Sequence, residues 1–287
     1  MLRRFEVQGF RCLKDLELDL EPFTVLVGPN GSGKTAILDA LGIRDVQVTD
    51  FWRRAPGEMR RYWTSELARG GDVHRLSPGG EVTREPLGEA VASPRVEVVR
   101  GETARLHAAI GAMAWREQRE LARRVCSLLP VFGDVVVEPG ERAGEYSLRF
   151  RDRWDSALWY SSVEVPAAAW VVVDVVALQH VALEAELVCV DDLGRGLHPY
   201  LLESFVGMLR GLTTGRDGRS PVQVFVTTHS AALLEHVHPR EARLLARSES
   251  DGATLLRAIP ADDPNWLATY DESMSAAWLS GGLGGVP

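Results

Sequence analysis

The stretch Val25-Leu-Val-Gly-Pro-Asn-Gly-Ser-Gly-Lys-Thr35 decides how this chain is interpreted. Its first three residues are apolar and predict a buried strand, and the glycines behind them open a turn onto a helix that begins near Gly33. A strand, a glycine-rich loop and a helix are the expected setting of the phosphate-binding motif G-x-x-x-x-G-K-[ST]. The alternative, a chance glycine-rich turn, is disfavoured by the strand and helix signals on either side. The stretch therefore predicts a site for ATP or GTP.

The residue types in this loop explain the chemistry that it predicts. Glycine adopts backbone angles that a Cβ forbids, so successive N–H groups can turn toward one anion, and the helix N-terminus adds its dipole. Lys34 would reach the β- and γ-phosphates, and the hydroxyl of Thr35 would bind Mg²⁺. The residues expected to contact the nucleotide are Gly28, Asn30, Gly31, Ser32, Gly33, Lys34, Thr35 and Ala36.

The composition is typical of a folded protein with a sizeable core. Of the 287 residues 45% are hydrophobic, and the net charge is −8, so any DNA contact needs a local basic patch. The cysteines at 12, 126 and 189 lack C-x-x-C spacing, which argues against a disulfide framework or a zinc site. No signal peptide opens the chain, and the most apolar region, 163–190, carries too many charges to span a membrane. We therefore expect a cytoplasmic protein without membrane partners.

The hydrophobic periodicity predicts an α/β fold. Residues 2–7 and 13–20 alternate apolar and polar side chains, as half-buried antiparallel strands do. Continuous apolar runs at 187–190 and 222–226 alternate with helical patterns, which indicates parallel strands covered on both faces. Further strands are expected at 23–27, 95–99, 135–137 and 146–150 and as a pair within 243–258, and helices at 33–42, 102–129, 166–185, 198–212 and 263–279.

Two regions resist this assignment. Between 44 and 94 the periodicity weakens among turn signals such as Gly70-Gly71, and no element can be placed there. We interpret about 44–130 as an insertion on the surface of one domain that spans 1–287. The chain ends in a glycine-rich tail, 280–287.

Polar residues follow the two buried strands at 187–190 and 222–226. Asp191 and Asp192 end the first, at the edge where open α/β sheets bind ligands. Asp191 would hold Mg²⁺ through water, and Asp192 would orient the attacking water as a general base. His229 follows the second strand, where it could sense the γ-phosphate. The alternatives are a helix cap or loop for the acidic pair and a merely exposed histidine beside a capping Thr228 or Ser230.

Together these segments resemble the ABC-type ATPase heads of the RecF, OLD and SMC-like class, in particular its small stand-alone bacterial ATPases. Residues 28–35 match the Walker A motif of that class. Asp191-Asp-Leu-Gly-Arg-Gly-Leu-His-Pro199 matches its extended Walker B motif and D-loop, Thr227-Thr-His-Ser230 its switch histidine, and Gly9-Phe-Arg-Cys-Leu-Lys14 its N-terminal hairpin. The resemblance covers nearly the whole chain and is weakest over 44–130.

This resemblance implies a P-loop NTPase fold of ABC-ATPase type, with a mixed central sheet, N-terminal antiparallel strands and helices on both faces. It also implies ATP and Mg²⁺ as ligands and a homodimer or larger assembly that encloses the nucleotide. Stand-alone members of the class often act with a separately encoded nuclease or toxin in bacterial defence against phage. A residue in the position of Arg11 can approach the base or the α-phosphate in this class.

Two departures from the class pattern predict slow hydrolysis. Asp192 stands where the class usually has glutamate, and its side chain is one methylene shorter. The class also docks the γ-phosphate of a partner subunit on a Ser-x-Gly signature. Here Ser161 and Ser162 survive, but Val163 replaces the glycine, and a β-branched residue would hinder close approach of the backbone.

We therefore expect an ATPase of weak activity that dimerises around nucleotide and regulates an effector. One alternative is a nucleotide-bound scaffold with negligible hydrolysis. Another is a RecF-like DNA-repair ATPase, because 51–54 and 60–63 interleave arginines with aromatics, as nucleic-acid surfaces do. Gln47 and Gln118 are candidates for the glutamine that couples Mg²⁺ to the neighbouring lobe, but neither lies in a recognisable context.

Overall fold

The computed structural model describes most of the chain, in eleven separate stretches. These are residues 1–42, 58–65, 69–76, 82–87, 94–100, 104–140, 146–181, 185–215, 220–260, 263 and 273–283.

A six-stranded sheet forms the centre of the described structure, with the strand order β14-β13-β3-β12-β11-β7. Its strands are β3 (Phe23–Val27), β7 (Val96–Val99), β11 (Leu187–Val190), β12 (Gln223–Thr228), β13 (Ala242–Arg247) and β14 (Thr254–Ala258). All neighbouring pairs are parallel except the hairpin β13–β14. The predicted parallel strands and the strand pair within 243–258 are confirmed, and the carboxyl ends of β3, β11 and β12 meet at one edge.

A second, antiparallel sheet begins at the N-terminus, with the order β2-β1-β4-β5-β6. Its strands are β1 (Leu2–Phe10), β2 (Leu13–Asp19), β4 (Glu58–Ser65), β5 (Arg69–Leu76) and β6 (Val82–Pro86). The predicted N-terminal strands are therefore confirmed, and the region without an assignment contains three more. Gly70 misled the sequence analysis because it lies inside β5, where a Cβ would come within 2.7 Å of the Trp63 indole nitrogen.

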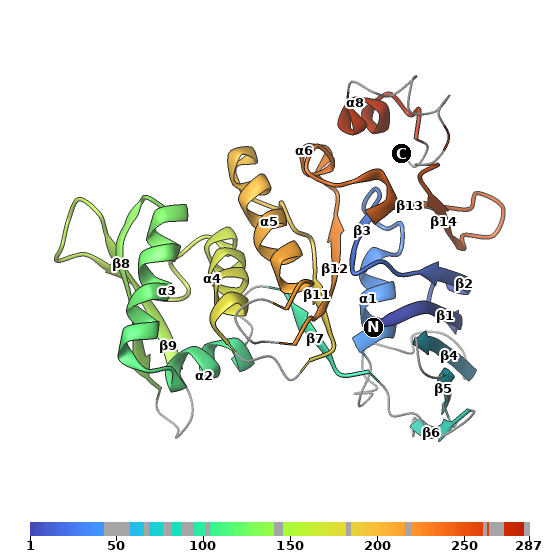
Figure 1. The fold of residues 1–287 in the computed structure, drawn as a ribbon, viewed down its shortest axis with the longest axis horizontal. Helices are drawn as coiled ribbons and strands as arrows, with labels where there is room; N and C mark the ends of the chain where they lie inside the picture. Colours follow the sequence, from blue (N-terminus) through green and yellow to red (C-terminus); the bar gives the residue numbers. More distant parts are fainter. Residues whose placement is uncertain are drawn as a thin grey trace.

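A third group of elements lies at the opposite end of the molecule from β4–β6 (Figure 1). It contains α2 (Ala104–Ala112), α3 (Trp115–Leu128), β8 (Phe132–Pro139), β9 (Tyr146–Asp152), β10 (Trp159–Tyr160) and α4 (Ala167–His180). Strands β8, β9 and β10 form a small antiparallel sheet.

The single helix predicted over 102–129 is wrong, because the chain breaks between α2 and α3. The side-chain amide of Gln118 donates to the carbonyls of Ile110, Gly111 and Met113 at the end of α2. The Glu117 carboxylate accepts from the backbone N–H of Ala114 at the start of α3. Gln118 thus satisfies carbonyls left free at the end of α2, and Glu117 fixes the residue that precedes α3. Gln118 is thereby committed to this turn.

The remaining elements follow β11 and β12. They are η1 (Pro199–Leu201), α5 (Leu202–Leu212), α6 (Ala231–Leu234), η2 (Pro239–Glu241) and α8 (Met274–Leu279). The helix predicted over 198–212 therefore starts with one 3₁₀ turn. Of the helix predicted over 263–279, only the part in α8 can be compared, since most of 263–272 lies outside the described residues. No helix in the described stretches is long and apolar enough to cross a membrane.

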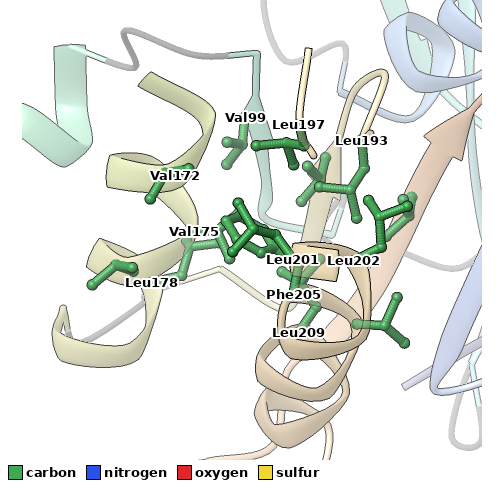
Figure 2. Close-up of a cluster of buried hydrophobic side chains, with 14 of the residues drawn as sticks. Val99, Val172, Val175, Leu178, Leu193, Leu197, Leu201, Leu202, Phe205 and Leu209 are labelled. Carbon is green, nitrogen blue, oxygen red and sulfur yellow. The ribbon is translucent and has the colours of Figure 1, made fainter. Parts of the chain in front are cut away.

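Strands β3, β11 and β12 of the central sheet are buried on both faces, as their continuous apolar sequences predicted. Side chains of β3, β11 and β12 alternate between two core clusters: Val25, Val188 and Val226 join one, while Leu26, Cys189 and Phe225 join the other. The first cluster includes α4 and α5, and Figure 2 shows their side chains gathered with Val99 of β7. The second holds α1 (Lys34–Gly42) and the N-terminal sheet. Helix α1 therefore packs on one face of the central sheet and begins where the loop that leaves β3 ends.

Candidate nucleotide-binding site

The phosphate loop joins β3 to α1, as the sequence predicted. Gly31 and Gly33 have φ angles of 80° and 108°, which favour glycine. The Lys34 ammonium donates to the carbonyls of Gly28 (2.7 Å) and Pro29 (2.8 Å). Burial lowers the pKa of Lys34, while the negative charges of Asp192 and Asp191 act in the opposite direction. The two predicted acidic residues are thus close enough to act electrostatically on this lysine.

The remaining loop residues divide by exposure. Asn30, Gly31 and Thr35 are exposed, so their polar groups are open to a ligand. Ser32 and Ala36 are buried beneath the loop. Sequence reasoning expected contacts from all of these residues, and the exposed subset has the access that such contacts need.

Thr227, at the end of β12, orients the acidic pair and was not singled out from the sequence. Its hydroxyl donates to Asp191 Oδ1 at 2.7 Å and accepts from the Asp192 backbone N–H at 2.8 Å. The Asp191 backbone N–H donates to the Val99 carbonyl of β7 at 2.8 Å. One hydroxyl therefore links the Asp191 carboxylate and the Asp192 backbone to the neighbouring strand. Its signal in the sequence was its place beside His229 at a strand end.

Asp192 and His229, predicted as catalytic, lie in direct contact. Asp192 Oδ1 is 2.5 Å from His229 Nδ1, and both side chains are partly exposed. Asp192 has a φ of 55°, in the left-handed region that non-glycine residues seldom occupy. Strained backbone of this kind concentrates at functional sites. Asp192 therefore combines direct contact with His229 and a strained backbone, two features that a catalytic residue can have.

A network of ion pairs extends from Asp191 to Arg11. Arg100, which directly follows β7, donates from Nε to Asp191 Oδ2 at 3.2 Å and also pairs with Asp39 of α1. Arg11 donates to the other oxygen of Asp39 at 2.5 Å. Burial lowers the pKa of Arg100, but the hydrogen bonds and charges of Asp39 and Asp191 outweigh it and leave that pKa raised.

Arg100 and Asp39 were missed by the sequence analysis. The position of Arg100 at the end of a parallel strand was the available signal, because that edge gathers the ligand-binding groups. Arg11 lies on the β1–β2 turn with a φ of 49° and is held over α1 by Asp39. Its contact with nucleotide stays a prediction.

The predicted signature residues lie in a turn that precedes α4, on the other side of the central sheet from α1. We call residues 161–164 the signature turn. The backbone N–H and the hydroxyl of Ser161 donate to Glu164 Oε2 at 2.7 and 2.6 Å. The Ser162 carbonyl accepts from the Trp170 indole at 3.2 Å, and Val163 is 88% exposed. Ser161 and Ser162 are therefore not brought to the phosphate loop of their own chain.

The arginine-rich segment proposed for nucleic acid is corrected in part. Arg61 and Trp63 are buried, and Arg61 pairs with buried Asp72 at 2.6 Å, so these two side chains cannot contact DNA. Arg60 is exposed and pairs with Glu58. Residues 51–54 and Gln47 lie outside the described part of the chain.

The donor set fits Mg²⁺ better than a protein-only metal centre. Among the described residues, no group of three or more His, Cys, Asp or Glu side chains could hold a metal. Mg²⁺ prefers oxygen ligands and keeps several waters, so one carboxylate, one hydroxyl and substrate phosphates suffice. Asp191, with its carboxylate oriented by Thr227, and the exposed Thr35 hydroxyl would supply the protein ligands.

Comparisons with known proteins give matches over parts of the chain. The family model "AAA ATPase domain" matches residues 1–43, and "AAA domain, putative AbiEii toxin, Type IV TA system" matches 23–88 and 172–235. The OLD nuclease of Thermus scotoductus is 52% identical over 52 residues, which are 18% of this chain. That match spans only 9% of the relative's length.

Solved structures resemble nearly the whole chain. The SMC head domain from Thermotoga maritima has a TM-score of 0.53 at 15% identity and covers 90% of this chain and 98% of its own. An SMC head bound to the C-winged helix domain of ScpA has a TM-score of 0.62 at 14% identity, over 91% and 98%. The phosphate loop with its acidic edge, the partial family matches and the fold shared with SMC heads support an ABC-type ATPase of the RecF, OLD and SMC-like class.

Proposed function

We propose that the chain binds ATP and Mg²⁺, hydrolyses ATP slowly within a dimer that encloses the nucleotide, and thereby regulates a separate effector. One observation carries the proposal. Lys34, the Asp191–Asp192 pair and His229 follow three adjacent parallel strands and meet at one edge of the sheet. Open α/β sheets bind ligands at this edge.

Lys34 is the residue that would recognise the phosphates. In the free chain it satisfies its charge with the carbonyls of Gly28 and Pro29. Bound ATP would offer charged oxygens in their place, and charge-assisted hydrogen bonds are the stronger kind. Mg²⁺ held by Thr35 and Asp191 would neutralise the phosphate charge. Thr227 and Arg100 each bond one oxygen of the Asp191 carboxylate and so fix its orientation.

Asp192 would act as general base and His229 would hold it in place. A base must come within about 3 Å of the proton that it removes, directly or through one water. The aspartate side chain is short, and its carboxylate oxygen already contacts His229 at 2.5 Å. Its reach toward an attacking water is therefore limited, which supports slow hydrolysis.

The dimer is supported by the location of the signature turn. Its serines lie with α4, on the side of the sheet opposite α1, so they would reach a nucleotide only on another copy of the chain. An effector role is supported by the descriptions of the matched proteins, one a putative toxin and the other a nuclease. We further propose that the regulated effector acts in bacterial defence against phage, as the resemblance to stand-alone members of the class implies.

The second candidate is a nucleotide-bound scaffold without turnover, favoured by the exposed Val163 and the short Asp192. Sizing of the purified protein with and without ATP·Mg²⁺, together with phosphate release, separates the two. A dimer that forms with ATP and releases phosphate slowly supports the switch. A persistent dimer without phosphate release supports the scaffold. If ATP neither binds nor changes the size, both are wrong; Lys34→Ala is the control.

A further inference from the structure

The β13–β14 hairpin, far from the phosphate loop in sequence, packs directly against it. A Cβ on Gly28 would lie 2.6 Å from the Leu245 carbonyl oxygen, and a Cβ on Gly33 would lie within 3.0 Å of the Thr254 hydroxyl. Both distances are shorter than real Cβ contacts, so only hydrogen fits at these two positions. The shape of the loop therefore depends on the hairpin as well as on glycine's conformational freedom.

Thr254 is the residue that makes hydrogen bonds across this contact. Its hydroxyl donates to the Ser32 carbonyl at 3.0 Å, and its backbone N–H donates to the Cys12 carbonyl at 2.9 Å. The side chain is buried, so water does not compete for either bond. One buried threonine thus links the phosphate loop to the β1–β2 turn, which carries Arg11.

A surface ion pair supports the same arrangement. Lys14 of β2 contacts Asp251, in the hairpin loop, at 2.9 Å. The hydrogen bond from the Ser248 side chain, followed by the one from Lys14, holds the pKa of Asp251 well below its usual range. Both side chains are half exposed, so the pair aligns the two hairpins with little effect on stability.

We propose that Thr254 is a positioning residue for nucleotide binding. Its hydroxyl holds the Ser32 carbonyl, and this keeps the N–H groups of the loop directed at the phosphates. The proposal rests on the proposed function of the loop, because it concerns how that loop is preorganised. If Thr254 acted through packing alone, its replacement by valine, which has a similar volume, would leave the loop and its ATP affinity unchanged.

The test compares Thr254→Val with Thr254→Ser, which keeps the hydroxyl. We expect Thr254→Val to weaken ATP affinity about fivefold, the size expected when one buried hydrogen bond is lost. Thr254→Ser should bind ATP as the wild type does, because it keeps the hydroxyl. Amide hydrogen exchange of residues 28–36 without nucleotide should be faster in Thr254→Val than in the wild type, because the loop loses its restraint.

Thr24→Val is the matched control. The Thr24 hydroxyl is also buried and exchanges hydrogen bonds with Glu21, but it lies at the other end of β3 from the loop. Unchanged loop exchange and unchanged ATP affinity in Thr254→Val would overturn the proposal, as would equal effects in Thr24→Val. If the wild type fails to bind ATP but loop exchange is still faster in Thr254→Val, then Thr254 does hold the loop and the proposed function is wrong.

Discussion

In the proposed dimer, ATP would lie between the phosphate loop of one chain and the signature turn of the other. Different kinds of contact restrain these two regions. The phosphate loop is restrained by residues distant in sequence, such as Leu245 and Thr254, and its helix is bonded at its far end by Arg61. The signature turn is held by near neighbours, Glu164 and Trp170. The first region is preorganised by the tertiary fold, whereas the second depends on bonds to residues close in sequence.

The largest effect should come from removing Arg61. Its guanidinium donates to the Ala40 carbonyl of α1 at 3.0 Å and pairs with buried Asp72. Arg61→Met would leave that carboxylate buried without its main partner, so we expect the free energy of unfolding to fall by about 3–5 kcal/mol. Urea denaturation measures it. Arg60→Met, at an exposed site on the same strand, should cost less than about 1 kcal/mol. Equal losses would refute the special role of Arg61.

Lys34→Ala should come next, through ligand binding rather than folding. Loss of a charged donor to phosphate should weaken ATP affinity about 100-fold, as expected for hydrogen bonds to charged groups. Isothermal titration with ATP·Mg²⁺ measures the change, and Arg123→Ala, at an exposed ion pair on α3, is the control. ATP binding that survives in Lys34→Ala would show that the preorganised loop is not the phosphate site.

Restoring the class pattern should raise turnover. Asp192→Glu lengthens the base by one methylene, and Val163→Gly removes the branched side chain from the signature turn. We expect the double variant to release phosphate about tenfold faster than the wild type, a modest share of what a well-placed general base contributes. An unchanged rate would mean that neither residue limits hydrolysis.

The smallest effect should come from the contact inside the signature turn. Hydrogen bonds from the Ser161 side chain and backbone lower the pKa of Glu164, so a negative charge occupies the donors that a γ-phosphate would need. Glu164→Gln should strengthen ATP-dependent dimerisation about threefold, within the range of exposed charge interactions. Sedimentation velocity with ATP·Mg²⁺ tests this, with Glu138→Gln, at an exposed ion pair on β8, as the control. Weaker dimerisation would indicate that Glu164 supports the turn instead of competing for it.

Short-range patterns were enough to predict much of this site. The strand, loop and helix around Lys34 are contiguous, and Asp191 and His229 each follow a continuous apolar strand. Parallel strands bring their carboxyl ends to one edge, so these residues could be expected to meet. In the structure Asp192 and His229 lie in direct contact.

Other features followed from no local pattern. Strand β5 contains two adjacent glycines that indicate a turn, yet Gly70 serves to accommodate the Trp63 indole. The two arginines in the segment 60–63 suggested a nucleic-acid surface, yet Arg61 is buried and bonds α1 and Asp72. In both cases the role of a residue depends on a neighbour from another strand.

The sequence by itself determined the fold class, the phosphate loop and the acidic edge, because each depends on residues within single strands and the turns that follow them. Only the tertiary structure decided what restrains that site. Thr227, Arg100 and Thr254 act on residues that are remote in sequence, and their hydrogen bonds exist only once the sheet has assembled. Local periodicity records which face of a strand is buried, whereas partners across strands depend on register and packing.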